Sequence, residues 1–377
     1  MAFREDERAS AGAGGSAPAP AGADPWARTF FEAHDAPALS FAVARGDGLA
    51  WCAAHGMADL EFAVPASTEH LFRLGSVSKI VTATAAARLV SRGLVELDTP
   101  ISYWLPDLPH HHRQTTLRQL FTHTGGVRHY LPKDLAGDGP GGPVIQRRYA
   151  SRAEILALFI DDELVAEPGT RVSYSSYGYT LASLVMEVAA GQDFVALVAD
   201  EIARPFALAS LCADDVQAIV PGRVSGYYTA REMAFLAAAA PGAAPPPASG
   251  DYTNMGLSNP AFCWAGAGLL ASMPDLARFG AAHLEGPHAG ITDAERALLF
   301  TPLTEGTGQQ PPLGLGWRVD EDRQGRPRWH HAGTTPGGRC GLVVYPEQGL
   351  SIALASNTFA TPGDVLGPAS ELAAMFG

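Results

Sequence analysis

Ser76 and Lys79 are the two residues whose types and spacing point most directly to chemistry. The chain has 26 Lys plus Arg, and only Lys79 and Lys133 are lysine. Arginine therefore serves nearly everywhere that a plain positive charge is needed. A guanidinium stays protonated at any relevant pH, whereas a desolvated ammonium can lose its proton and act as a base. A lysine three residues after a serine predicts a serine nucleophile that the lysine activates.

The local sequence predicts a helix over residues 76–92. This stretch is rich in Ala, Val and Leu, contains no Pro or Gly, and is followed by Gly93. Residues three apart on a helix have Cβ atoms about 5–6 Å apart, so Lys79 Nζ can reach Ser76 Oγ. The helix is apolar nearly all round, and we expect it to be buried. Burial and the positive end of the helix dipole both disfavour the charged form of Lys79. The alternative is an N-cap serine beside a solvated lysine.

Two other segments carry side chains that can complete this chemistry. Tyr174 and Ser176 lie in a loop that leads into a predicted helix. A tyrosine near Lys79 can share its proton and act as a base, and Ser176 can hold Lys79 or a substrate carbonyl. Residues 328–334 are typical of a strand, which places His331 and Gly333 on one face. A glycine in a strand often marks the close approach of a ligand or another backbone. The alternatives are an aromatic packing residue and a structural histidine.

No metal site and no cofactor site are expected. His110, His111 and His112 with His123 suggest a metal site at first sight. Three consecutive histidines cannot all point one way, and no carboxylate is suitably spaced, so an exposed loop is favoured. The glycine-rich stretch at 137–143 lacks the following Gly-Lys-Ser/Thr of a phosphate cradle, which favours a surface loop.

Composition restricts the class of protein and its partners. The 377 residues are 47% hydrophobic and 17% charged, as in a globular enzyme with a large core. No apolar run reaches the length of about 18 residues that a transmembrane helix needs. The net charge of −13 argues against nucleic acid and anionic membranes as partners, and favours a small-molecule substrate. Oligomeric state leaves no signal in the sequence.

The ends of the chain and its cysteines lead to two further expectations. Residues 1–25 are rich in Ala, Gly, Pro and Ser, so we expect a disordered segment. It has no apolar core of a secretory signal peptide. The four cysteines are scattered without a C-x-x-C pair, which favours reduced thiols and a cytoplasmic location.

The pattern along the chain is β, then α, then β. Ala38–Arg45 and Leu49–His55 flank a Gly-Asp-Gly turn and predict a hairpin. The clearest further elements are helices at 151–162, 177–190, 274–283 and 364–376, and strands at 328–334, 340–345 and 350–356. We expect an α/β (α+β) fold in which an antiparallel sheet formed by both termini is flanked by helices and carries an inserted all-helical domain. The sheet domain would comprise residues 26–96 and 286–377, and the helical domain residues 97–285.

Four ordered motifs resemble the serine β-lactamase and penicillin-binding protein superfamily. They are Phe72–Lys79, Leu120–Gly126, Pro168–Tyr179 and His331–Gly333, and the resemblance covers roughly residues 30–360. Their order and separations are similar to the class C, esterase and D-aminopeptidase branch. The nearest likeness is to mitochondrial serine β-lactamase-like proteins, through residues 126–130 and 264–268.

The resemblance implies a site in a cleft between a sheet domain and a helical domain. Ser76 would be the nucleophile, and Lys79 and Tyr174 would handle its proton. The backbone N–H groups of Ser76 and Thr334 would form the oxyanion hole. Gly333 and Ser176 would contact the substrate.

Two departures from the superfamily pattern bear on the substrate. Ser176 stands where lactamases often have Asn, and His331 stands where they usually have the Lys of Lys-Thr-Gly. His331 removes a permanent cation from the position that holds a substrate carboxylate, and its own charge would change around its ordinary pKa of about 6.5, so a carboxylate-bearing substrate should bind better at acidic pH. The alternative is that His331 is a catalytic residue in the proton network around Tyr174. These changes disfavour strong β-lactamase activity. They favour esters, amides or peptides that lack this carboxylate.

The sequence thus predicts a serine hydrolase that forms an acyl-enzyme on small esters, amides or peptides. One alternative is an acyltransferase that uses the same acyl-enzyme. Another is a non-catalytic penicillin-binding or scaffold protein on the same fold.

Overall fold

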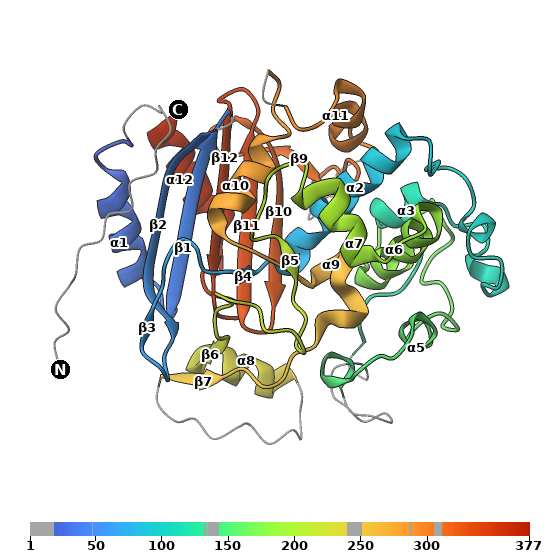
Figure 1. Ribbon diagram of the computed structural model, residues 1–377, viewed down its shortest axis with the longest axis horizontal. Coiled ribbons are helices and arrows are strands. Elements are labelled where there is room, and N and C mark those ends of the chain that lie inside the picture. Colours follow the sequence, from blue (N-terminus) through green and yellow to red (C-terminus); the bar gives the residue numbers. More distant parts are fainter. Residues whose placement is uncertain are drawn as a thin grey trace.

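A seven-stranded antiparallel sheet built from both ends of the chain forms the centre of the molecule (Figure 1). The computed structural model describes residues 19–46, 48–131, 134, 143–239, 251–286, 289–304 and 311–377. The strands follow the order β3-β2-β1-β12-β11-β10-β9. Their bounds are β1 (Ala38–Arg45), β2 (Gly48–Asp59), β3 (Val64–Pro65), β9 (Arg318–Glu321), β10 (Pro327–Thr335), β11 (Gly338–Tyr345) and β12 (Leu350–Ser356).

The first and last strands of the chain are neighbours in this sheet. β1 pairs with β12 in the register Phe41↔Leu354, and with β2 in the register Phe41↔Ala53. Every residue of β12 is buried. Continuous burial rather than alternation follows because helices cover both faces of the sheet.

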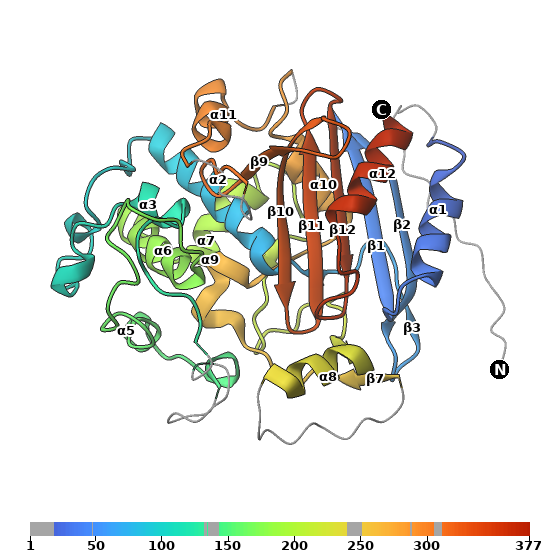
Figure 2. The ribbon, with the colours of Figure 1, turned by 180° about the vertical axis from the view of Figure 1, so that it is seen from behind.

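Eleven helices of the described residues surround the sheet. They are α1 (Ala23–Glu32), α2 (Ser78–Ser91), α3 (Leu117–Phe121), α5 (Arg152–Leu156), α6 (Ser176–Ala190), α7 (Phe194–Val198), α8 (Ala230–Ala239), α9 (Trp264–Ala267), α10 (Met273–Ala281), α11 (Asp293–Phe300) and α12 (Leu366–Phe376). α1 and α12 lie on one face of the sheet, and α10 lies on the other (Figures 1 and 2). Two small sheets complete the fold. One has the order β4-β8-β5, from Phe72–Arg73, Leu269–Ala271 and Cys212–Ala213, and the other pairs β6 (Tyr227–Thr229) with β7 (Tyr252–Asn254).

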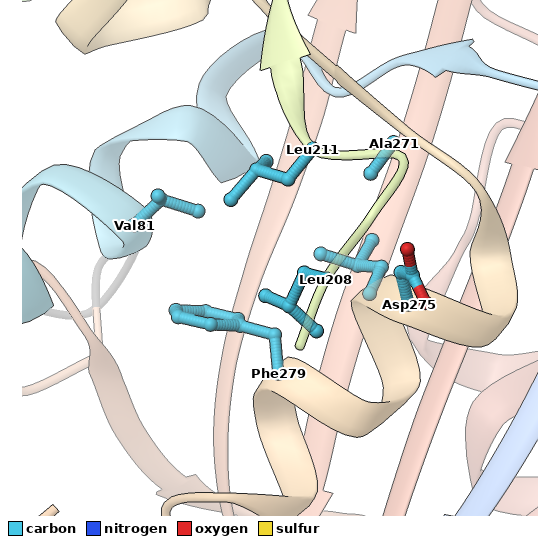
Figure 3. Close-up of a pocket in the computed structure, with 7 residues that line it drawn as sticks. Val81, Leu208, Leu211, Ala271, Asp275 and Phe279 are labelled. Atoms are coloured by element: carbon cyan, nitrogen blue, oxygen red, sulfur yellow. The ribbon is translucent and has the colours of Figure 1, made fainter. Parts of the chain in front are cut away.

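Helix α2 is enclosed by protein and links the sheet to the helical part of the chain. Eleven of its 14 residues are buried, and it contacts α6, α9 and α11. On the side toward α10, Val81 approaches the side chains of Leu211 and Phe279 (Figure 3). The space between these side chains does not admit a water molecule. The burial of most residues of α2 restricts the position of the helix and therefore of whatever lies at its first turn.

Most of the expected elements are present, with differences that have local causes. The helix expected at 151–162 reduces to α5, which is followed by turns at 157–162. Strand β9 was not anticipated, because four residues with no clear alternation give little signal. Helix α10 lies on the sheet although its residues fall inside the expected helical domain, so the expected division of 97–285 is wrong there.

The expectations for the N-terminal segment and the glycine-rich loop have different outcomes. Ala23–Pro25 belong to α1 rather than to a disordered segment, because Trp26 and Ala27 pack into the core beneath the sheet. Residues 1–18, and residues 137–142 of the glycine-rich stretch, lie outside the described residues. Within the described part, no single helix has the length and apolar character to cross a membrane, and only the bent pair 176–190 with 194–203 meets those criteria together.

Candidate active site

Ser76 lies at the junction between β4 and α2, where the backbone touches strand β10. A short 3₁₀ turn over Gly75–Val77 precedes the helix, and Gly75 has a φ of +51°. A Cβ at Gly75 would lie 2.7 Å from Thr334 N, and a Cβ at Gly333 would lie 2.9 Å from Ser76 N. The two N–H groups expected to form an oxyanion hole therefore belong to adjoining backbone segments. Glycine is required at positions 75 and 333 because a side chain at either position would push the two backbone segments apart.

Lys79 is fully buried and surrounded by oxygen atoms. Its Nζ donates to Ser76 Oγ at 3.2 Å, to Ser176 Oγ at 3.0 Å and to the carbonyl oxygen of Gly266 at 2.7 Å. An ammonium has three hydrogens to donate, and each has an oxygen here. Ser176 begins α6 and Gly266 lies in α9, so three helices meet at this nitrogen.

Tyr174 points its hydroxyl at the same serine. Its OH donates to Ser76 Oγ at 2.8 Å, and Lys79 Nζ lies 4.8 Å from the centre of its ring. Burial acts to raise the pKa of Tyr174, but the positive charge of Lys79 and hydrogen bonds from Lys79 and Ser76 outweigh it, so the pKa falls below 10. A tyrosine with a lowered pKa is better suited to exchange a proton with Ser76.

Strand β10 brings His331 to the site as a neutral ring. His331 is 2% exposed, and its Nδ1 lies 2.7 Å from the carbonyl oxygen of Ala332. Burial, followed by the charges of Arg318 and Lys79, holds the pKa of His331 well below 6.5. This shift disfavours the charged form that pairing with a substrate carboxylate would need, and the role of His331 in the proton network around Tyr174 stays a prediction.

A permanent cation is nevertheless close to the site. Arg318 at the start of β9 lowers the pKa of His331, of His123 and of Tyr174. The pairing of β9 with β10 places Arg318 opposite His330, 12 residues further along the chain. No local motif marks Arg318, so the sequence alone could not single it out.

Gly266 and two histidines also contact the predicted residues and were not assigned to the site. Ser175 N donates to His123 Nδ1 at 3.1 Å, and Ser176 N donates to His129 Nδ1 at 3.3 Å. His123 was considered only as a metal ligand with the histidine run, whereas His112 of that run is buried and bonds to the carbonyl oxygen of Ile160. Within the described ranges, no three His, Cys, Asp or Glu side chains gather to hold a metal ion.

Each predicted residue now has a place. Ser76, Lys79, Tyr174 and Ser176 form one hydrogen-bonded cluster. Thr334 lies beside it through its backbone. Gly333 meets the carbonyl oxygen of Leu74, to which a Cβ would come within 2.0 Å, so its close approach is to backbone. A serine with two proton-exchanging neighbours and backbone N–H groups beside it can form and stabilise an acyl intermediate.

Known proteins resemble this chain in sequence and in fold. The mitochondrial serine beta-lactamase-like protein LACTB of Mus musculus is 22% identical over 405 residues, which cover 83% of this chain and 70% of that protein. Esterase EstB of Burkholderia gladioli is 34% identical over 179 residues, 44% of each chain. The penicillin binding protein from Bacillus halodurans has the same fold, with a TM-score of 0.74 at 22% identity over 88% of this chain and 95% of that one.

The family match extends over nearly the whole chain. It covers residues 23–374, from the first turn of α1 to the last turn of α12. The resemblance drawn from four motifs and the expected fold class are both confirmed. Relatives named as an esterase and as a penicillin-binding protein support a serine hydrolase in general. The chain belongs to the Beta-lactamase family.

Proposed function

We propose that this protein hydrolyses small esters, amides or peptides through an acyl-enzyme on Ser76. One observation carries the proposal: Ser76 Oγ lies 2.8 Å from Tyr174 OH and 3.2 Å from the buried Lys79 Nζ. A free serine hydroxyl is a weak nucleophile, and two adjacent groups that exchange protons are what its activation requires.

The proposed reaction has two halves. Ser76 Oγ attacks the substrate carbonyl carbon while its proton passes to the phenolate form of Tyr174, which the positive charge of Lys79 favours. The bond to the leaving alkoxide or amine then breaks, and the leaving group takes that proton. In the second half, water gives its proton to Tyr174, attacks the acyl carbon and releases the acid together with a restored Ser76 hydroxyl. The backbone N–H groups of Ser76 and Thr334 would receive the negative oxygen in both halves.

The substrate class follows from the surroundings of Ser76. The site contains the positive Lys79, with Arg318 nearby, and the neutral His331. This favours leaving groups and acyl groups that are neutral or carry negative charge over cationic ones. An esterase among the relatives and amide-cleaving enzymes among proteins of the same fold are consistent with both ester and amide substrates.

Covalent labelling tests the proposal. Ser76→Ala should abolish labelling by a fluorophosphonate probe and lower kcat on p-nitrophenyl esters by at least about 10³-fold. Ser91→Ala, at the exposed end of the same helix, is the matched control and should label like wild type. Labelling of Ser76→Ala at another serine would refute the assignment. A panel of p-nitrophenyl esters, nitrocefin, and D- and L-aminoacyl amides would then rank the substrate classes.

A further inference from the structure

The loop at 122–131 lies directly against the segment that carries Tyr174 and Ser176. Ser173 N donates to the carbonyl oxygen of His123 at 2.7 Å, and Ser175 N donates to His123 Nδ1 at 3.1 Å. Ser176 N donates to His129 Nδ1 at 3.3 Å. Two successive backbone amides at the start of α6 therefore end on imidazole nitrogens rather than on solvent.

These hydrogen bonds determine the protonation state of both rings. A backbone N–H only donates, so Nδ1 of His123 and of His129 must each offer a lone pair. An imidazolium has no lone pair on either nitrogen, and the bonds exist only with the neutral rings protonated at Nε2. Burial first, and the charge of Lys79 second, lower the pKa of His123 well below 6.5 and that of His129 to about 4.

The same two rings pack on the ring of Tyr174. The His123 ring centre lies 4.4 Å from that of Tyr174 at an angle of 42°, and the His129 ring centre lies 5.4 Å away at 89°. An aromatic ring held by one tilted and one edge-on neighbour has few orientations open to it. The hydroxyl of Tyr174 at the far end of this ring is the atom that bonds to Ser76 Oγ.

The backbone of His123 adopts an uncommon conformation. Its φ is +59°, and the residue is 4% exposed. A non-glycine residue in this region is energetically unfavourable, and it persists where the surroundings require it. Here the conformation lets one residue present both its carbonyl oxygen and its ring nitrogen to the Tyr174 segment.

We propose that His123 and His129 are positioning residues that orient Tyr174 and Ser176 toward Ser76 and Lys79. Each accepts one amide of the Ser175–Ser176 turn and packs against the Tyr174 ring. The proposal rests on the proposed function for the role of Tyr174. It adds two residues that touch no reacting atom but determine where the proton-exchanging hydroxyl lies.

Matched substitutions distinguish the contribution of the Nδ1 acceptor from that of the rest of each imidazole ring. Asn and Gly both tolerate a positive φ, but only Asn keeps an acceptor near the position of Nδ1. His123→Gly and His129→Leu should lower kcat on a p-nitrophenyl ester by about 30-fold to 100-fold, as expected for a displaced catalytic group. KM should change less than about threefold, because neither ring binds the substrate. His123→Asn and His129→Asn should stay within about fivefold of wild-type kcat.

A second measurement reads the position of Tyr174 without any substrate. The phenolate absorbance of Tyr174, taken as the difference from Tyr174→Phe, should titrate at higher pH in His123→Gly and His129→Leu than in wild type. The reason is that the lowered pKa of Tyr174 depends on its contacts with Lys79 and Ser76. His112→Asn, at a buried histidine that bonds to Ile160 outside the site, is the control for general loss of stability.

The two measurements distinguish the inference from the proposed function. An unchanged Tyr174 titration in both His123→Gly and His129→Leu would overturn the inference. It would also be overturned if His123→Asn and His129→Asn lost as much kcat as His123→Gly and His129→Leu. If His123→Gly fails to fold, the His129 pair decides alone, since His129 is only partly buried. If wild type neither labels at Ser76 nor cleaves esters, the proposed function fails, and a raised Tyr174 pKa in the variants still supports positioning by the two histidines.

Discussion

At the scale of single residues, the surroundings of Lys79 explain why a lysine stands there in a chain with only one other lysine, Lys133. Three oxygen acceptors enclose a nitrogen that is fully buried. A compact ammonium fits among them, whereas a planar guanidinium spreads five N–H groups over a larger area. The lysine can also pass a proton to Tyr174 or Ser76, which arginine cannot do.

Lys79→Arg should therefore be nearly as damaging as Lys79→Ala, although it keeps the charge. We expect both variants to lose at least about 10²-fold in kcat on a p-nitrophenyl ester. Fluorophosphonate labelling rates and thermal denaturation should be measured in parallel, because a lower melting temperature alone would not explain a slower labelling rate. Retention of more than about a tenth of the wild-type rate by Lys79→Arg would show that a positive charge alone suffices at this position, and that neither the compact ammonium nor proton transfer by Lys79 is required.

At the scale of elements, the site depends on strand β10 touching the first turn of α2. Gly333 in β10 and Gly75 before α2 allow the two backbones to meet without side chains between them. The burial of 11 of the 14 residues of α2, and its contacts with α6, α9 and α11, resist a movement of the helix that would accommodate a larger residue. The separation of the Ser76 and Thr334 backbones is thus fixed by packing on both sides.

Gly333→Ala should disrupt this contact while leaving the fold intact. The new Cβ would lie 2.0 Å from the Leu74 carbonyl oxygen and 2.9 Å from Ser76 N, so the backbones must separate. We expect kcat/KM on a p-nitrophenyl ester to fall by at least about 10²-fold, because the oxyanion donors no longer converge. Gly256→Ala, where a Cβ meets nothing within 4 Å, should behave like wild type in the same assay. Wild-type kcat/KM in Gly333→Ala would show that the two N–H groups do not act together.

At the scale of the whole molecule, the fold encloses several neutral histidines that the unfolded chain would expose. Burial lowers the pKa of His112, of His129 and of His283 to about 4. His283 is fully buried, and its ring bonds to Thr84 and to the carbonyl oxygen of Phe279. Each ring must take up a proton when the chain unfolds at acidic pH, so unfolding becomes easier there.

The free energy of unfolding should decrease as the pH falls from 7 to 5. A histidine with a depressed pKa stabilises the fold fully above about 6.5, and this contribution is lost as the pH falls toward 4. His283 alone should contribute a loss of about 2 kcal/mol over this interval. Urea denaturation at both pH values should show a smaller difference for His283→Gln than for wild type, and an unchanged difference for His110→Gln at an exposed position. An equal pH dependence in His283→Gln would exclude this ring as a cause.

The sequence by itself singled out Ser76 as the candidate nucleophile, Lys79 beside it, and most of the elements that carry them. Ser76 and Lys79 lie one helical turn apart, so their contact is a local property that spacing on a helix predicts. The strands near both ends were recognisable because apolar runs bounded by turn residues encode them locally. The motifs around Tyr174 and His331 could be found in the sequence, but their distances from Ser76 could not.

Only the tertiary structure decided which distant residues complete the site and what charge they carry. His123 and Gly266 reach the Ser76–Lys79–Tyr174 cluster through contacts that span 52 and 187 residues of sequence. Arg318 comes near because β9 pairs with β10, and burial together with that arginine keeps His331 neutral. The burial of a side chain and the charges near it depend on residues from many distant parts of the sequence. No local pattern of residue types therefore predicts the resulting pKa shift. For this reason the sequence predicted a serine hydrolase in general, whereas the low pKa of His331 became apparent only in the structure.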